Sequence, residues 1–213
     1  MVECVLFDFD GTVYDTVEGI TRSVRYALNK RGLDAELNEL RCFAGPPLNE
    51  IFAERYGLSA EEARAAVADF RERYTPVGVY ESEPFPGIGE LLARLRAAGK
   101  TLGVATSKPQ HLAELLLERA GLSGLFDLIC GADPEAGRSA KWEMIADAMV
   151  KGGMTADKTV LVGDTKYDVV GAHRVGIPCI GVRWGYAAAG ELEAAGADAI
   201  AADMAELERM LLT

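Results

Sequence analysis

The hydrophobic positions of the chain follow two different rhythms. From residue 16 to about residue 82 they recur at helical spacing, and no run in that stretch has the pattern of a strand. Before this stretch, and again after residue 88, short apolar runs alternate with helical segments. Strands joined by crossover helices predict a parallel sheet covered by helices on both faces. We therefore expect an α/β fold with a Rossmann-like parallel sheet, into which an all-helical segment is inserted.

The change of rhythm also predicts the domain boundaries. We assign residues 1–15 and 83–213 to an α/β core domain and residues 16–82 to a helical domain. The return passage, residues 83–87, contains two prolines that stiffen it. The first strand begins at the N-terminus, and the later predicted strands are 101–105, 127–131, 159–164, 178–182 and 197–201.

Polar residues gather where the predicted strands end. Asp8 and Asp10 follow the first strand, and two carboxylates side by side need a neighbouring cation, although an Asp-Gly turn would also fit. A hydroxyl at a helix start can bind phosphate or cap the helix. Because ligands of such sheets bind beyond the carboxyl ends of the strands, we expect these groups to converge. The four groups are Asp8 with Asp10 and Gly11; Thr106, Ser107 and Lys108; Lys141; and Asp164 with Asp168.

Composition and charge narrow the class of partner. The 213 residues carry a formal net charge of −11, which argues against nucleic acid or an anionic membrane as the main partner. No apolar stretch approaches the roughly 20 residues that span a bilayer. The four cysteines lack metal-type spacing and are expected as reduced core residues. We expect a cytoplasmic protein, monomeric or homodimeric, that binds a small molecule.

Taken in order, the four groups resemble the four motifs of the haloacid dehalogenase (HAD) superfamily. The match spans nearly the whole chain, and each motif lies at a predicted strand end or helix start. The helical insert resembles the cap domain of the subfamily that includes phosphoglycolate phosphatases, pyrophosphatases, β-phosphoglucomutases and haloacid dehalogenases. The matching stretches are Asp8-Phe9-Asp10-Gly11-Thr12, Thr106-Ser107-Lys108, Lys141 and Gly163-Asp164-Thr165-Lys166-Tyr167-Asp168.

The resemblance implies a Mg²⁺-dependent phosphatase that works through an aspartyl-phosphate. Asp8 would be the nucleophile, Asp10 the general acid and base, and Lys141 a balancing charge. The resemblance implies that Mg²⁺ binds Asp8, the Asp10 carbonyl and Asp164, with Asp168 as a ligand or a support. The phosphoryl oxygens of a small phosphate ester would be bound by Gly11, Thr106, Ser107 and Lys108.

Departures from individual relatives narrow the reaction. Asp10 argues against a dehalogenase, and Ile20 stands where β-phosphoglucomutases carry a histidine. Lys30, the single lysine of the insert, lies near a helix end, which argues against a phosphonate-cleaving relative. The remaining reactions are hydrolysis of a phosphomonoester and hydrolysis of pyrophosphate. Phosphoglycolate, nucleotides and sugar phosphates are all possible phosphomonoester substrates. A non-catalytic relative that binds phosphate ligands is the alternative from another class.

Other residues are assigned from their local context. The segment 41–48 resembles the substrate-reading loop of phosphoglycolate phosphatase-like proteins, in which Arg41 would meet an anionic leaving group and Gly45 and Pro46 would hold the loop rigid. A surface arginine before a helix breaker would look the same. His111 and His173 are expected at the surface without a paired acid.

Overall fold

The computed structural model describes residues 2–133, 138 and 140–212. The chain divides into two compact units, Met1–Tyr14 with Pro84–Thr213, and Asp15–Glu83. Strand β2 (Tyr14–Asp15) pairs with strand β3 (Glu83–Pro84) where the chain leaves the first unit and returns to it. The sequence pattern did not predict these two short strands.

The first unit contains a six-stranded sheet in the order β5-β4-β1-β6-β7-β8, in which all pairs are parallel. The α/β class predicted from the alternating pattern is therefore confirmed. Its strands are β1 (Cys4–Phe7), β4 (Thr101–Pro109), β5 (Leu128–Ala132), β6 (Thr159–Gly163), β7 (Cys179–Val182) and β8 (Ala199–Ala201).

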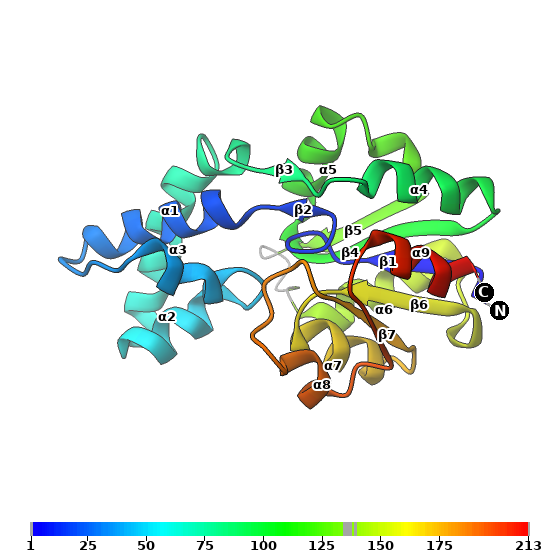
Figure 1. Ribbon diagram of the computed structural model, residues 1–213. Coiled ribbons are helices and arrows are strands. Elements are labelled where there is room, and N and C mark those ends of the chain that lie inside the picture. The colour runs from blue at the N-terminus through cyan, green and yellow to red at the C-terminus, as the bar shows by residue number, and fades with distance from the viewer. Residues whose placement is uncertain (1, 134–137, 139, 213) are drawn as a thin grey trace. The chain divides into compact units, whose positions relative to one another are not determined.

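Helices cover both faces of this sheet (Figure 1). Helices α4, α5 and α9 pack on one face, and α6, α7 and α8 lie on the other. Burial on both faces explains why the central strands are unbroken apolar runs: Val5, Leu6 and Phe7 of β1 are fully buried. The helices are α4 (Ile88–Ala97), α5 (Gln110–Arg119), α6 (Lys141–Gly152), α7 (Lys166–Arg174), α8 (Glu191–Ala195) and α9 (Met204–Leu212), with 3₁₀ helices η3 (Ser123–Leu125) and η4 (Ala156–Lys158).

The strand order places β1 between β4 and β6. From β1 the sheet grows toward β4 and β5 on one side and toward β6, β7 and β8 on the other, so the strand order reverses at the centre. Loops that leave the sheet at such a reversal diverge and leave room for a ligand beyond the carboxyl ends of the strands. The polar groups predicted at the ends of β1, β4 and β6 therefore meet at this edge.

The second unit is helical apart from its boundary residues in β2 and β3, within the described part of the chain. A capping box begins α3 (Ala60–Tyr74), because Ser59 Oγ accepts from Glu62 N while Glu62 Oε2 accepts from Ser59 N. Phe43 and Phe52 are buried with ring centroids 4.8 Å apart. The helices are α1 (Val17–Asn29), α2 (Leu48–Tyr56) and α3 (Ala60–Tyr74), with 3₁₀ helices η1 (Leu37–Phe43) and η2 (Gly78–Tyr80).

Several local expectations are corrected. Strand β4 continues through Pro109, so the segment predicted to lie between a strand end at residue 105 and a helix start belongs to the strand. Cys130 and Cys179 are buried, but Cys4 and Cys42 are half-buried, so only two of the cysteines are core residues; all four are free thiols. His173 has an acidic partner, since its Nε2 lies 2.9 Å from Asp198 Oδ2.

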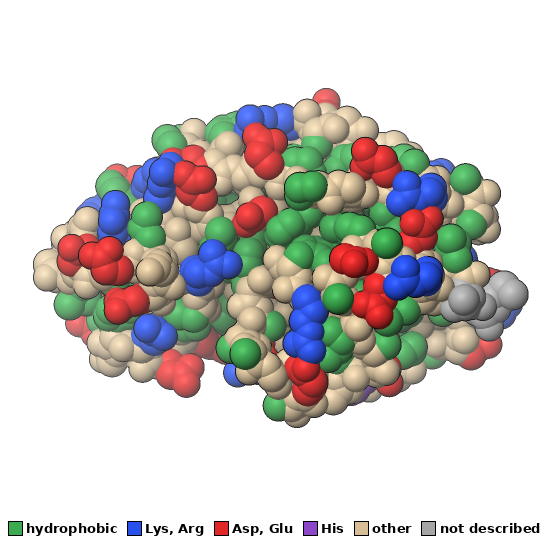
Figure 2. Space-filling view, in the orientation of Figure 1, with side chains coloured by type: hydrophobic (Ala, Val, Ile, Leu, Met, Phe, Trp, Pro, Cys, Tyr) green, Lys and Arg blue, Asp and Glu red, His purple; other side chains and the backbone are tan. Residues whose placement is uncertain are grey.

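Charged side chains of both signs are interspersed on the face of each unit drawn in Figure 2. The blue lysines and arginines stand beside red aspartates and glutamates on this face and do not gather into a basic patch. Among residues 2–133, 138 and 140–212, no helix has the length and apolarity needed to cross a bilayer.

Candidate active site

The carboxylates of Asp8, Asp164 and Asp168 form an acidic cluster beyond the ends of β1 and β6. One oxygen from each lies within 4.8 Å of the others, and all three residues are buried. The backbone of Asp8 is fixed by continued pairing with β6, since its N–H donates to Val162 O at 2.8 Å. Side chains on two neighbouring strands and the helix after β6 thus meet at one point.

Lys141 brings a positive charge into the acidic cluster from the start of α6. Its Nζ contacts Asp8 Oδ1 and lies 2.7 Å from Asp168 Oδ1, and the lysine side chain is 8% exposed. The charge of one ammonium group balances at most one of the three carboxylates. The cluster therefore keeps an excess of negative charge when all its groups are ionised.

Burial and the neighbouring charges shift the pKa values of the cluster. Burial raises the pKa of Asp8 to about 7; Lys141 opposes this rise, whereas Asp168 and Asp10 add to it. Burial, followed by the charges of Asp168 and Asp8, raises the pKa of Asp164 well above its usual range. Burial alone would lower the pKa of Lys141, but Asp168 and Asp8 raise it above its ordinary value. The raised pKa values of the two aspartates and of the lysine all indicate a site that favours additional positive charge.

The donor atoms of the acidic cluster suit Mg²⁺. They are carboxylate oxygens, which hard divalent cations prefer, and they come from residues that are held in place by the sheet and by hydrogen bonds. The predicted ligands Asp8, Asp164 and Asp168 lie together, whereas the side chain of Asp10 lies outside the cluster. This arrangement agrees with the expectation that Asp10 would bind Mg²⁺ through its backbone carbonyl oxygen.

The spacing of Asp164 and Asp168 follows from the beginning of α7. Asp168 Oδ2 accepts from both Thr165 N at 3.0 Å and Thr165 Oγ1 at 2.9 Å. Thr165 and Asp168 thereby form the N-terminal capping box of the helix. One carboxylate follows β6 directly, while the other caps the next helix and turns its second oxygen toward Lys141.

A second ion pair lies beside the acidic cluster. Lys108 Nζ lies 2.9 Å from Asp10 Oδ1, and the lysine side chain is 3% exposed. Thr106 Oγ1 accepts from Lys108 N at 3.1 Å, so the Thr106 hydroxyl supports the local backbone. Ser107 is half-buried and Gly11 is buried. The structure thus brings all the predicted residues of the core unit to one edge of the sheet.

The loop after β7 contacts the acidic cluster, although it holds none of the predicted site residues. Tyr186 N donates to Asp164 Oδ2 at 2.8 Å, and Thr12 Oγ1 donates to Asp164 Oδ1 at 3.1 Å. The Trp184 indole Nε1 in turn donates to Thr12 O at 3.1 Å. Both oxygens of Asp164 are therefore oriented by hydrogen bonds. The position of this loop, directly after a strand of the same sheet, was the available signal.

Two glycines make room for Asp164. A Cβ atom built on either Gly11 or Gly185 would overlap the Asp164 carboxylate. Gly11 also has φ +86°, which side chains disfavour, and it forms the turn after β1. The backbone thus approaches the carboxylate more closely than any larger residue would allow.

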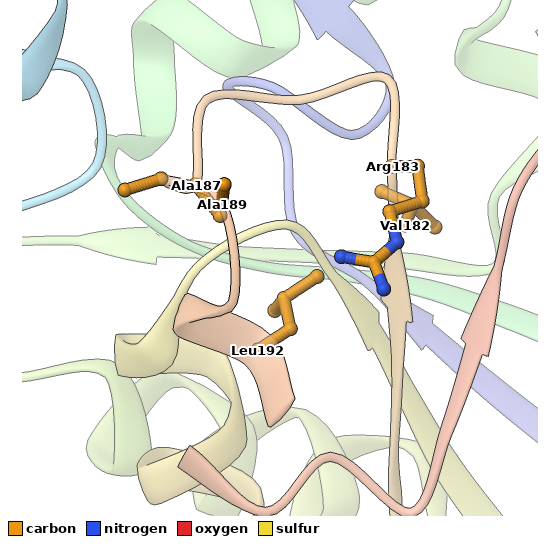
Figure 3. A pocket seen from close by; sticks show the side chains of 6 residues that line it. Val182, Arg183, Ala187, Ala189 and Leu192 are labelled. Carbon is orange, nitrogen blue, oxygen red and sulfur yellow. The ribbon is translucent and has the colours of Figure 1, made fainter. Parts of the chain in front are cut away.

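A cavity beside this loop is separate from the acidic cluster. It has a volume of about 300 Å³ and is lined by Val182, Arg183, Ala187, Ala188, Ala189 and Leu192 (Figure 3). None of these residues is among the predicted site residues. The guanidinium group of Arg183, visible in Figure 3, pairs with Glu193. This cavity is therefore distinct from the candidate active site.

The predicted specificity residues lie in the helical unit. Arg41 is exposed, and Gly45 and Pro46 are half-buried. Within this unit Arg41 lines a cavity of about 120 Å³ together with Val17, Thr21, Leu37 and Asn38. Arg41 thus stands among apolar and neutral polar neighbours that a small ligand group can contact.

Comparisons with known proteins identify the class. The chain is 40% identical to a 5'-nucleotidase of Pseudomonas aeruginosa over 208 residues. This match covers 97% of this chain and 94% of that protein. It is 32% identical to a phosphoglycolate phosphatase of Xanthomonas campestris over 85% of this chain and 83% of that protein. The crystal structure of a predicted phosphatase from Clostridium acetobutylicum matches with a TM-score of 0.96 and 38% identity, covering 100% and 99% of the two chains.

These similarities define the protein as a hydrolase of the phosphatase type. The profile of the family described as Haloacid dehalogenase-like hydrolase matches residues 5–182. The chain belongs to this family, as the order of its motifs predicted.

Replacing Gly185 by Ala should impair the site without unfolding the protein. The new Cβ overlaps Asp164, so the Asp164 side chain or the loop that carries residue 185 must shift. Because misplacement of an active-site group by about 1 Å costs on the order of 10²-fold, we expect a comparable loss in 4-nitrophenyl phosphate hydrolysis. Circular dichroism should be unchanged. Gly124→Ala, where a Cβ meets nothing within 4 Å, is the matched control. Full activity in Gly185→Ala would contradict the role of the loop.

Proposed function

We propose that this protein is a Mg²⁺-dependent phosphatase of small phosphorylated metabolites that works through an aspartyl-phosphate on Asp8. The observation that carries the proposal is the buried cluster of Asp8, Asp164 and Asp168 in contact with Lys141. A carboxylate nucleophile, oxygen donors for a cation and a fixed ammonium group are the parts that phosphoryl transfer requires.

In the first step an oxygen of Asp8 attacks phosphorus, and the bond between phosphorus and the ester oxygen breaks. Asp10 donates its proton to that oxygen, so the leaving group departs as an alcohol. In the second step water attacks phosphorus of the aspartyl-phosphate and gives a proton to Asp10. The bond between phosphorus and Asp8 breaks, inorganic phosphate is released, and both aspartates return to their starting states.

The residues of the core unit would divide the binding of charge between them. Asp8, Asp164, Asp168 and the Asp10 carbonyl group would hold Mg²⁺, which when bound supplies positive charge to the phosphoryl oxygens. Lys141, already in contact with the nucleophile, balances negative charge as the phosphoryl group is transferred. Additional hydrogen bonds to the phosphoryl group would come from the Gly11 N–H and from Thr106 and Ser107.

We further propose that residues 16–82 act as a specificity domain for the leaving group. Arg41 would meet a polar or anionic group of the substrate, while Gly45 and Pro46 shape the adjoining loop. The cavity beside Arg41 supports this role, because its neutral lining suits the uncharged part of such a group.

Nucleoside 5'-monophosphates are the first substrate class to test. The similarity to the 5'-nucleotidase extends over nearly the whole of both chains, including the helical insert. Phosphoglycolate is the second candidate, which the more distant phosphoglycolate phosphatase supports. Both substrates lose inorganic phosphate from an alkyl oxygen, so the same core chemistry serves either.

Asp8→Asn should abolish turnover while the fold is kept. The amide is close to isosteric but cannot attack phosphorus, so we expect a loss of at least about 10³-fold in phosphate release. The melting temperature should be equal or higher, because burial of the charged Asp8 is unfavourable in a site that raises its pKa to about 7. Glu3→Gln, at an exposed acid directly before β1, is the matched control. Substantial metal-dependent activity in Asp8→Asn would refute the assignment of the nucleophile.

Removal of the metal should be fully reversible. A chelator should abolish phosphate release, and added Mg²⁺ should restore it and raise the melting temperature of the stripped protein, since the cation relieves repulsion among the carboxylates. Asp164→Asn should require at least about tenfold more Mg²⁺ in both measurements, by comparison with other metal-site variants. The exposed Asp157→Asn should behave as the unmodified protein. Equal activity with and without the chelator would contradict the metal requirement.

A substrate panel should rank nucleoside 5'-monophosphates first. Phosphate release would be compared for these, phosphoglycolate, sugar phosphates and pyrophosphate, and the expected margin in kcat/KM is at least about tenfold. Arg41→Ala should change the ranking, whereas Arg64→Ala, at an exposed position of the same unit, should not. A higher kcat/KM for phosphoglycolate would select the second candidate. Conversion of a sugar phosphate into its isomer with little free phosphate would indicate a mutase and contradict the proposal.

A further inference from the structure

Lys108 occupies an unusual position for a lysine. Its side chain is 3% exposed, and its ammonium group lies 2.9 Å from Asp10 Oδ1. A lysine is rarely buried unless it is paired. Lys141, the other buried lysine of this edge, contacts Asp8 and Asp168. The two lysines therefore serve different carboxylates.

The backbone of β4 directs Lys108 to this place. The pairing of β4 with β5 shifts register between Thr106 and Pro109, and such irregularities re-aim side chains at the ends of strands. Thr106 Oγ1 accepts from Lys108 N at 3.1 Å, which holds the shifted segment. The ring of Phe9 lies 5.5 Å from Lys108 Nζ, measured to the ring centroid. Strand, hydroxyl and ring together fix the direction of the ammonium group.

We propose that Lys108 is a positioning residue that orients Asp10 for proton transfer to the leaving group. This inference rests on the proposed function, in which Asp10 is the general acid and base. Lys108 donates to Oδ1 of Asp10, which leaves the other oxygen, Oδ2, to give up and take up the proton in the reaction. In the first step Oδ2 gives this proton to the departing alkoxide oxygen, and in the second step Oδ2 receives a proton from the attacking water.

This role differs from the direct phosphate contact that the place of Lys108 in the second motif suggests. A phosphate-binding lysine would affect every phosphate ester and inorganic phosphate alike. A lysine that orients the general acid would affect esters according to their leaving groups, because a weakly basic leaving group needs little protonation. The dependence on the leaving group therefore distinguishes the two roles.

The test uses two esters of similar shape, phenyl phosphate and 4-nitrophenyl phosphate. Lys108→Met keeps the length and apolar stem of the side chain but removes its charge. We expect kcat/KM for phenyl phosphate to fall about 10²-fold and that for 4-nitrophenyl phosphate less than about threefold, since general acid catalysis contributes on the order of 10²–10⁴. The inhibition constant of inorganic phosphate should stay within about threefold. Lys108→Arg should restore part of the phenyl phosphate activity.

Lys158→Met is the matched control, because Lys158 forms an exposed pair with Glu3 at the opposite end of the strands. All three constants should be unchanged in it. Two results in Lys108→Met would overturn the positioning role. One is an equal fall in kcat/KM for both esters. The other is a rise in the inhibition constant of inorganic phosphate by the same factor as the fall in kcat/KM. If Lys108→Met does not fold, Lys108→Gln, which keeps a polar end, is measured against the same criteria.

The failure of this inference can be told apart from failure of the proposed function. The unmodified protein must hydrolyse both esters, and Asp8→Asn must hydrolyse neither; these results depend on the proposed function alone. The ratio of kcat/KM for phenyl phosphate to kcat/KM for 4-nitrophenyl phosphate in Lys108→Met depends on the positioning role. If the unmodified protein is active and this ratio is the same in Lys108→Met, the proposed function stands and the role of Lys108 is refuted.

Discussion

Burial of like charges is the constraint on which this site depends. Three carboxylates lie within 4.8 Å of one another in the interior, and moving each from water costs several kcal/mol. Lys141, the Thr165 hydroxyl and the Tyr186 N–H offset part of that cost. The raised pKa of Asp8 shows that the compensation is incomplete. A site that is under-compensated in this way favours the binding of a divalent cation.

The sheet supplies the rigidity that this arrangement needs. Asp8 continues the pairing of β1 with β6, Lys108 belongs to β4, and Asp164 directly follows β6. Each group is thus fixed by backbone hydrogen bonds of a buried parallel sheet. The two ion pairs, Lys141 with Asp8 and Lys108 with Asp10, separate the aspartate proposed as nucleophile from the aspartate proposed as proton donor, although the two are close in sequence. Different roles for similar side chains follow from different neighbours.

The proposed roles divide chemistry and selectivity between two parts of the chain. The residues proposed for phosphoryl transfer lie in the first unit, and those proposed for specificity lie in residues 15–83. Relatives with the names 5'-nucleotidase and phosphoglycolate phosphatase match this chain over 97% and 85% of its length. A core that binds the phosphoryl group can be kept while a separate insert changes the preferred leaving group.

The sequence by itself determined the α/β class, the helical insert and the family, because hydrophobic periodicity and motif order are local properties of the chain. It also marked Asp8, Asp10, Lys141, Asp164 and Asp168, although it left their partners open. Only the tertiary structure decided that Lys108 pairs with Asp10, 98 residues away, and that Tyr186 binds Asp164, 22 residues away. It likewise extended β4 through Pro109. Such contacts depend on how strands align in space, which no local pattern encodes.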